Sequence, residues 1–372
     1  MGIRVGFDAS AAIEGAGVGR YTVSLLRSLL TQAVDEEYVL LLSRDAANDE
    51  VVRQLVARRS ILPVSRHTSE VLWQRLRLPV VVEWFTGRLD VFHSPNYLLP
   101  PLRSARSVVT IHDLSFLKLP QYAHPRLAAY LRGAVPRSIR RAEVILADSQ
   151  STADDVIELL RISPKRVRVV YPGVEPRFSP QVEEGEAERL TERYSLQRPY
   201  LLGVGTIEPR KNYRAMIEAF VSAHDRCGFT GELVIAGGIG WLAEDALLAA
   251  KQAGERVRLL GRFPEQDLPA LYRQALALVY ASHYEGFGFP PLEAMACGTP
   301  VLVSRCSSLP EVVGEAGLYC QTDKESIAKA MTELLRDDDL RARLRAAGIE
   351  QAKRFSWEKT AQQVRQLYHE VA

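Results

Sequence analysis

Short apolar runs rich in β-branched residues alternate along the chain with longer stretches whose apolar positions recur at helical spacing. The first half carries such runs at 3–7, 39–42, 91–93, 108–111, 144–148 and 167–170, and the second half at 200–205, 233–236, 257–260, 276–280 and 301–304. Repeated strand–helix units of this kind build parallel sheets. The pattern therefore predicts an α/β protein with two parallel sheets.

The two halves meet in a segment that is poor in strand-forming residues. Prolines interrupt Tyr171–Pro180 and remove backbone donors, and charged residues dominate 183–193. We place the interdomain linker here, with an N-terminal domain over 1–180 and a C-terminal domain over 195–355. The remaining residues have a helical pattern that is interrupted at Gly348 and begins again after Ser356, an N-cap residue type.

The composition of the chain disfavours several classes of protein. The 372 residues contain 47 Lys and Arg and 45 Asp and Glu, a formal charge of +2, which disfavours a broadly basic nucleic-acid surface. Cys227, Cys297, Cys306 and Cys320 lack Cys-x-x-Cys spacing, as expected of buried thiols in a reducing compartment. Neither a signal peptide nor an apolar run near the ~18 residues of a membrane span is apparent, so we expect a cytoplasmic protein.

A glycine cluster follows the first predicted strand. Gly15, Gly17 and Gly19 precede a helical pattern that starts at Tyr21. Glycines at such a turn let backbone N–H groups approach an anion, and a mobile surface loop is the alternative. The spacing fits the dinucleotide-binding fingerprint poorly and no acidic ribose partner is clear, which disfavours a nicotinamide dehydrogenase.

Two cations follow the first strand of the second half. Arg210 and Lys211 stand between strand 200–205 and a helix predicted from Tyr213. Positive charge at a helix start opposes the helix dipole, so a merely solvated position is an awkward explanation. At the carboxyl edge of a parallel sheet, such cations suit a diphosphate.

A second loop follows strand 276–280 and begins with Glu285. Gly286 and Gly288 permit a tight turn, and the prolines at 290 and 291 favour a helix start. Glu293, one turn into that helix, can accept two hydrogen bonds from a ribose diol. This strand–loop–helix pattern predicts an anion site.

These motifs together resemble a known family. The Glu-x7-Glu spacing of Glu285 and Glu293 encloses Gly-Phe-Gly-Phe-Pro and precedes Ala-Cys-Gly-Thr-Pro-Val, as in the retaining nucleotide-sugar glycosyltransferases of family 4 with the GT-B fold. The resemblance extends over nearly the whole chain. It includes Gly17-Val-Gly-Arg20, Ile111-His-Asp113, Ala147-Asp-Ser149, Pro172-Gly-Val174, Glu208-Pro-Arg-Lys-Asn212 and Leu309-Pro-Glu-Val312.

The resemblance implies two facing Rossmann-like domains, with helix 357–372 crossing back to the first. The second domain would bind the donor and the first the acceptor. Arg210 and Lys211 would hold the diphosphate and Glu293 the ribose. Glu285, with the backbone at Phe287, Gly288 and Phe289, would contact the donor sugar. Gly17 would contact the phosphates, His112 the transferring sugar, and the loop with Arg262 and Phe263 the base. Val18 and Asp113 are further substrate-binding candidates.

One position departs from the family pattern, because Thr206 stands where many members carry Arg. The division of labour between Arg210 and Lys211 is therefore open. The Glu-Pro-Arg-Lys-Asn variant is most similar to bacterial mannosyltransferases that build O-antigen and other surface polysaccharides, so GDP-mannose is the first donor expected. The alternatives are a UDP-sugar hexosyltransferase, a nucleotide-sugar epimerase and a non-catalytic binding subunit.

The resemblance also implies retention, by same-face attack with His112 orienting the reactants. A double displacement through Glu285 is the alternative. We expect no cofactor and no metal: Arg210, Lys211 and the helix opened by the prolines meet the phosphate charge, and the seven His are scattered. The acidic triplet 337–339 could mimic a metal motif, but acids favour a helix start.

The acceptors expected of such an enzyme are a glycan or a lipid-linked glycan. Two segments combine apolar bulk with cations, namely 72–77 and the predicted helix that carries Arg132, Arg137, Arg140 and Arg141. Interfacial helices share this character. Docking to anionic lipid at the inner face of the membrane is one interpretation, and ordinary packing with a solvated basic face is the other.

Overall fold

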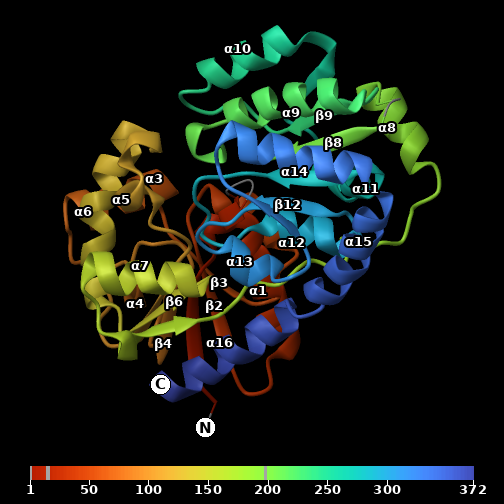
Figure 1. Cartoon of the computed structure of the whole chain (residues 1–372). Coiled ribbons are helices and arrows are strands. Elements are labelled where there is room, and N and C mark those ends of the chain that lie inside the picture. Colours follow the sequence, from red (N-terminus) through yellow and green to blue (C-terminus); the bar gives the residue numbers. More distant parts are fainter. Residues whose placement is uncertain (1, 14–16, 197–198) are drawn as a thin grey trace. The chain divides into compact units, whose positions relative to one another are not determined.

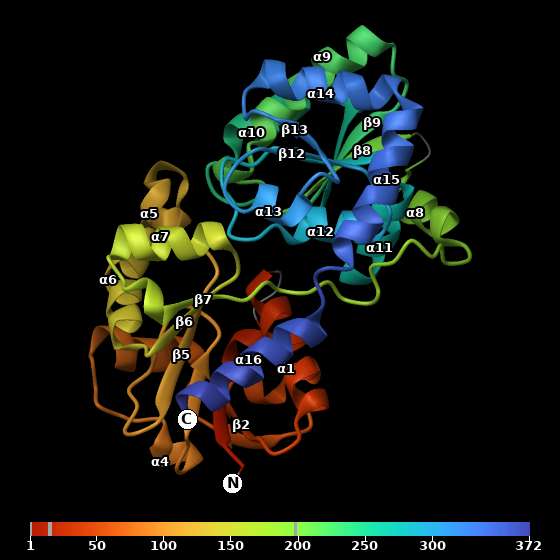
Figure 2. The same cartoon turned by 60° about the horizontal axis from the view of Figure 1, so that its bottom comes forward.

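The computed structural model describes residues 2–13, 17–196 and 199–372, and the chain divides into two compact units (Figures 1 and 2). Unit 1 holds the residues up to Lys118, Pro125–Gly173 and Phe355–Ala372. Unit 2 holds Leu119–His124 and Val174–Arg354.

Unit 1 is built on a seven-stranded parallel sheet in the order β3-β2-β1-β4-β5-β6-β7. All six apolar runs of the first half form strands. The edge strand β3 was missed in the sequence because its arginines are exposed and break the apolar pattern. The strands are β1 Arg4–Asp8, β2 Glu37–Leu42, β3 Arg58–Ile61, β4 Val91–Ser94, β5 Arg106–Ile111, β6 Val144–Ala147 and β7 Val167–Val169.

The helices of unit 1 cover this sheet. The first of them already begins at Gly17, before the Tyr21 predicted from the sequence, because glycines are tolerated in a first turn whose N–H groups need no helical partner. Gly15 lies outside the described residues. The helices are α1 Gly17–Gln32, α2 Glu50–Arg53, α3 Arg66–Glu70, α4 Glu83–Thr86, α5 Ser115–Lys118, α6 Pro125–Arg141, α7 Gln150–Leu160 and α16 Trp357–Val371.

Unit 2 is built on a six-stranded parallel sheet in the order β10-β9-β8-β11-β12-β13. Its strands are near-continuous apolar runs, as expected where helices cover both faces. The five predicted runs form strands, and the short β13 was missed. The strands are β8 Tyr200–Val204, β9 Glu232–Ala236, β10 Val257–Gly261, β11 Ala277–Tyr280, β12 Val301–Ser304 and β13 Leu318–Cys320.

The helices of unit 2 form two layers. Figures 1 and 2 show α9, α10 and α14 on one face of the sheet and α11, α12 and α13 on the other. The helices are α8 Glu186–Tyr194, α9 Tyr213–Cys227, α10 Glu244–Ala253, α11 Leu268–Gln274, α12 Phe289–Ala296, α13 Leu309–Val313, α14 Lys324–Arg336 and α15 Asp338–Ala352.

The charged stretch that the sequence suggested as a linker is ordered. It forms α8, which belongs to unit 2 and buries Leu190. Glu186 is also buried, because Arg273 of α11 donates to both of its carboxylate oxygens, at 2.6 and 3.2 Å. The chain passes from unit 1 to unit 2 between Gly173 and Val174, within the predicted linker segment Tyr171–Pro180. Glu186 is a charged residue type that is usually exposed, but here its pairing with Arg273 allows it to be buried.

The C-terminal helices also refine the prediction. Helix α15 runs through Gly348, where a Cβ would lie 3.2 Å from Cγ of Met295, so this glycine permits close packing and does not end the helix. Asp337 accepts the N–H of Leu340 as the N-cap of α15, so the acidic triplet is a helix start. Ser356 caps α16 through the N–H of Lys359, as predicted.

Helix α16 packs on α1 within unit 1. The hydroxyl of Ser28 donates to the carbonyl of Trp357 at 3.0 Å. Tyr368 shares a 2.6 Å hydrogen bond with Nδ1 of His93, which is fully buried and belongs to the core. At the start of the helix, a Cβ on Gly173 would lie 2.1 Å from the backbone nitrogen of Trp357, so only glycine fits.

Candidate functional site

The strand order of unit 2 reverses beside β8. The chain moves from β8 outward to β9 and β10, and then returns to the other side of β8 with β11. In open parallel sheets, ligands bind outside the carboxyl ends of the strands at such a reversal. The loops that follow β8 and β11 carry the predicted residues Arg210, Lys211 and Glu285.

The structure brings these three side chains into one ion cluster. Lys211 Nζ lies 2.8 Å from Oε1 of Glu285, and Arg210 Nη1 lies 2.8 Å from Oε2 of the same carboxylate. Arg210 also donates to Oε1 of Glu208 at 2.6 Å and to the carbonyl of Tyr284 at 2.8 Å. Two cations and two carboxylates therefore meet at the carboxyl edge of the sheet.

Glu285 is charged in this environment. Burial alone would raise the pKa of its carboxyl group, but the charges of Arg210 and Lys211 outweigh burial and lower the pKa to about 2. Burial lowers the pKa of the Lys211 ammonium, although Glu285 opposes that shift. At neutral pH, Glu285 can accept hydrogen bonds but has no proton to donate.

The loop that carries Glu285 is held by two serines after β12. The Oγ atom of Ser307 accepts the N–H of Glu285 at 2.8 Å. The hydroxyl of Ser308 donates to the carbonyls of Glu285 at 2.9 Å and Phe287 at 2.6 Å. Neither these serines nor Glu208 were among the residues predicted for the site. Ser307 and Ser308 directly precede the motif that begins at Leu309, and Glu208 opens the motif that contains Arg210 and Lys211, so their place in the sequence could have indicated a role.

Helix α12 begins where the prolines indicated. Gly288 precedes it with φ +117°, a conformation that L side chains rarely adopt, and the first turn starts at Phe289. Phe287 is buried and contacts Phe289 edge-on. Glu293 is also buried, and its Oε2 accepts the hydroxyl of Tyr272 at 2.9 Å. The two acids of the Glu-x7-Glu spacing thus face different partners.

A glycine-rich loop after β9 supports the cationic turn. A Cβ on Gly237 would lie 2.0 Å from the carbonyl oxygen of Gly205, and one on Gly240 would lie 2.7 Å from Cγ2 of Thr206. Arg262 borders the same loop, because its Cγ lies 3.3 Å from the Cβ position of Gly238, and its neighbour Phe263 is half-buried. The expected base-binding residues therefore adjoin the segment that positions the cations.

In unit 1, His112 follows β5 and contacts two acceptors. Its Nδ1 lies 2.6 Å from Oδ2 of Asp148, and its Nε2 lies 2.8 Å from the carbonyl oxygen of Pro95. When Asp148 is ionised, both ring nitrogens donate to these oxygens, which is the hydrogen-bonding pattern of an imidazolium. Burial raises the pKa of Asp148, and the charge of His112 opposes that shift. Burial lowers the pKa of His112, but Asp148 outweighs it and the pKa is raised.

Asp113 bonds within its own loop, and Asp148 is the acid that pairs with His112. Oδ1 of Asp113 accepts the N–H of Ser115 at 2.8 Å. Gly17 and Val18 lie in the first turn of α1, with Gly17 exposed and the carbonyl of Val18 accepting the hydroxyl of Thr22 at 2.9 Å. These residues and His112 follow β1 and β5 at the carboxyl edge of the unit 1 sheet.

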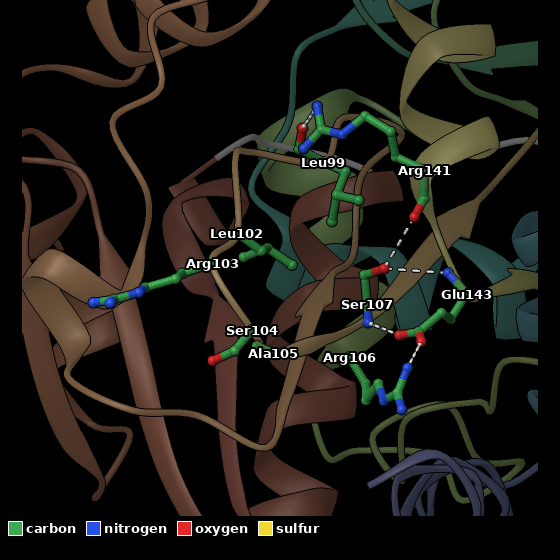
Figure 3. Close-up of a pocket in the computed structure, with 9 residues that line it drawn as sticks. All are labelled: Leu99, Leu102, Arg103, Ser104, Ala105, Arg106, Ser107, Arg141 and Glu143. Carbon is green, nitrogen blue, oxygen red and sulfur yellow. Dashed lines mark hydrogen bonds and ion pairs between the residues drawn. The ribbon is translucent and has the colours of Figure 1, made fainter.

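A separate pocket of about 370 Å³ lies at the opposite edge of that sheet, where β5 begins (Figure 3). Arg141 at its rim donates to the carbonyls of Leu99 and Pro100, and Glu143 accepts the N–H of Ser107 and pairs with Arg106. These contacts join α6 to the loop before β5. Arg141, a candidate for lipid contact, thus has a packing role.

Other chemistry-bearing groups are dispersed over the described residues. All four cysteines are free, with Cys297 and Cys320 buried as expected and Cys227 and Cys306 half-buried. Asp35, Glu36 and His369 form a small cluster, but Arg365 occupies Glu36 through two hydrogen bonds. None of the helices over the described residues combines the length and apolar character that spanning a bilayer requires.

The His112–Asp148 pair predicts a pH dependence of stability. A raised pKa in the folded state stabilises the fold fully below the unfolded value and loses that contribution as the pH rises through the folded value. We expect the melting temperature of the wild type to fall from pH 6 to pH 9 more steeply than that of Asp148→Asn. Asp225→Asn, at the exposed His224–Asp225 pair, should keep the wild-type slope. Equal slopes for wild type and Asp148→Asn would contradict the imidazolium.

The chain is similar to known proteins over nearly its whole length. Residues 15–178 match the model of Glycosyltransferase Family 4, and residues 187–351 match that of Glycosyl transferases group 1. O-antigen chain mannosyltransferase B of Escherichia coli is 33% identical over 371 residues, covering 95% of each chain. The serotype-specific mannosyltransferase WbdA of Escherichia coli is 29% identical, over 96% of this chain and 46% of its own length.

Solved structures share the fold. Anabaena Alr3699/HepE, in complex with UDP and glucose, has a TM-score of 0.74 at 17% identity and covers 99% of both chains. WaaG, a glycosyltransferase involved in lipopolysaccharide biosynthesis, has a TM-score of 0.73 at 17% identity over 98% of this chain and 99% of its own. The chain therefore belongs to the family 4 glycosyltransferases of the GT-B fold, which transfer a sugar from a nucleotide-sugar donor.

Proposed function

We propose that the protein is a retaining, metal-independent hexosyltransferase that moves mannose from GDP-mannose to a glycan or lipid-linked acceptor in surface polysaccharide biosynthesis. The observation that supports this best is the cluster in which Arg210 and Lys211 share the carboxylate of Glu285 at the strand-order reversal of unit 2.

The cluster suits the charge that develops during the reaction. Cleavage of a glycosyl phosphate leaves negative charge on the diphosphate, and preorganised cations stabilise that charge where it forms. Arg210 and Lys211 are held before any ligand arrives, so little reorganisation is needed. In this proposal they take the part that a divalent cation plays in other transferases, and a chelator should leave transfer intact.

Glu285 fits an anchoring role better than a nucleophilic one. Each of its oxygens contacts a cation at 2.8 Å, which withdraws electron density from the carboxylate. Such a group can accept sugar hydroxyls, and retention then proceeds by same-face attack in which the departing phosphate oxygen takes the acceptor proton. In this proposal His112 orients the reactants and is not the base, because Asp148 and Pro95 already occupy both of its ring nitrogens.

The donor assignment follows the relatives. The Escherichia coli proteins that match nearly the whole chain are named as mannosyltransferases, one of them for the O-antigen chain. Glu293, on the first turns of α12, is the proposed ribose ligand, and Arg262 with Phe263 would border the base. A UDP-sugar remains the alternative donor for the same site.

Donor choice can be measured by thermal shift with GDP-, UDP- and ADP-sugars. A ligand at about 100 times its dissociation constant adds ~2.7 kcal/mol of stability. We expect GDP-mannose to raise the melting temperature most, with and without EDTA. A larger shift with a UDP-sugar would overturn the donor assignment and leave the reaction class intact, and release of free nucleotide without acceptor would indicate the epimerase.

Two substitutions separate binding from transfer. Glu285→Ala removes the sugar anchor but leaves both cations, so it should bind GDP at least as well as wild type while transfer falls by about 100-fold or more. Lys211→Ala removes a diphosphate contact and should weaken both binding and transfer. Asp245→Ala, an exposed acid on α10, is the matched control. Wild-type transfer rates in Glu285→Ala would exclude that residue from the mechanism.

We also propose that unit 1 contacts anionic lipid from the cytoplasmic side. Segment 71–78 lies along α6, since Arg137 donates to the carbonyl of Gln74 and Arg75 lies 5.7 Å from the ring of Tyr130. Leu76, Leu78 and Leu127 are 60%, 39% and 51% exposed, and α6 contains five arginines and no acid. Exposed apolar side chains among cations suit an anionic membrane surface.

Vesicle sedimentation tests this contact. Wild type should bind anionic vesicles at low salt and release them at high salt, because surface charge interactions are screened. Arg77→Glu with Arg132→Glu should abolish binding without disturbing packing, since both side chains are exposed. Lys165→Glu, elsewhere on unit 1, should keep it. Sedimentation that is the same with and without anionic lipid would favour ordinary packing instead.

A further inference from the structure

Lys211 is held by a residue that none of the motifs includes. Tyr280 ends β11 and is buried, and its hydroxyl oxygen accepts a hydrogen bond from Nζ of Lys211. The same ammonium donates to Oε1 of Glu285 at 2.8 Å. An ammonium has three N–H donors. Among the described residues, these two oxygens are its hydrogen-bond partners, so one donor is left over.

The surroundings leave Lys211 little freedom. Its stem passes over Gly205, where a Cβ would lie 3.5 Å from Cε of the lysine. Gly205 is fixed in turn, because its carbonyl accepts the hydroxyl of Tyr213 at 3.0 Å. A lysine side chain is otherwise flexible and binds as a mobile point charge. Here a rigid aromatic ring on a central strand fixes one of its donors.

We propose that Tyr280 is a positioning residue that aims the third N–H of Lys211 at the departing diphosphate. The inference rests on the proposed function of the cluster. Tyr280 contacts no reacting atom itself. Without its hydroxyl, the Lys211 ammonium would be oriented by its hydrogen bond to Glu285 alone.

The charges around Lys211 indicate how the phenol acts. Glu285 and Tyr280 face the ammonium from β11 and its loop, Glu208 and Arg210 from the turn after β8, and Tyr213 from α9. Burial raises the pKa of Tyr280 far above its ordinary value, and the charge of Glu285 and a hydrogen bond to it add to that shift. The phenol is therefore neutral, and its oxygen accepts from Lys211. Its loss would remove one acceptor from a buried ammonium, which lowers the pKa of Lys211 further.

The test is GDP binding by calorimetry across pH 6 to 10. Tyr280→Phe deletes one oxygen atom. We expect its affinity for GDP to fall about tenfold, the size of one lost hydrogen bond to a charged group. The alkaline limb of its binding profile should also move to lower pH, because Lys211 loses its proton earlier. A purely structural role for the hydroxyl would not move that limb.

The matched control is Tyr200→Phe. This tyrosine is equally buried, and its hydroxyl donates to the carbonyl of Leu271 at 2.8 Å from the start of β8. Its substitution should lower the melting temperature but keep the GDP affinity and the pH profile. A double-mutant cycle adds the link to the lysine: in a Lys211→Gln background, Tyr280→Phe should cost little further affinity.

The results of these experiments distinguish failure of the positioning role of Tyr280 from failure of the proposed function. If Tyr280→Phe keeps both the affinity and the pH profile of wild type, or if its loss adds fully to that of Lys211→Gln, Tyr280 has no positioning role. If wild type itself binds no nucleoside diphosphate, the proposed function fails. Should Tyr280→Phe not fold, 3-fluorotyrosine at this position keeps the shape while weakening the acceptor, and it should move affinity and pH limb in the same direction.

Discussion

The site depends on one carboxylate that binds two cations. Arg210 and Lys211 are adjacent in the chain and extend from the same turn. Glu285 contacts each of them through a separate carboxylate oxygen, so the two cations are fixed relative to each other. Without the acid, two positive charges at a helix start would repel each other and oppose the helix dipole. The carboxylate makes a cationic site tolerable in the absence of ligand.

The fold supplies this meeting of charges. Arg210 and Glu285 are remote in sequence, and they approach because β8 and β11 are neighbours in the sheet while the intervening chain builds β9 and β10 on the other side of β8. The loop after β12 adds Ser307 and Ser308, which fix the backbone of 285–287. Three neighbouring strand ends thus contribute to one small volume.

Much of this could be predicted from the sequence. Buried strands are apolar runs, and the glycines and prolines before α12 carry the turn chemistry that their backbone angles require. What the sequence hid were residues whose surroundings reverse their ordinary meaning. The arginines of β3 hid its strand pattern. Glu186 was expected to be exposed, because its partner Arg273 lies far along the chain. His112 pairs with Asp148 and not with the adjacent Asp113.

The close approach of Gly173 to the start of α16 has a consequence for how the segment that follows it could be replaced by that of a related protein. The chain leaves unit 1 just after this glycine and re-enters it just before Ser356, and the two backbones touch there. The segment between them is therefore joined to unit 1 at two adjacent points, like an insertion into a single surface loop. Recombination between related genes could exchange that segment without a spacer to bridge distant ends, provided that a glycine is kept at the first junction and that the segment still fits Leu119–His124, the part of unit 2 that comes from the first half of the chain.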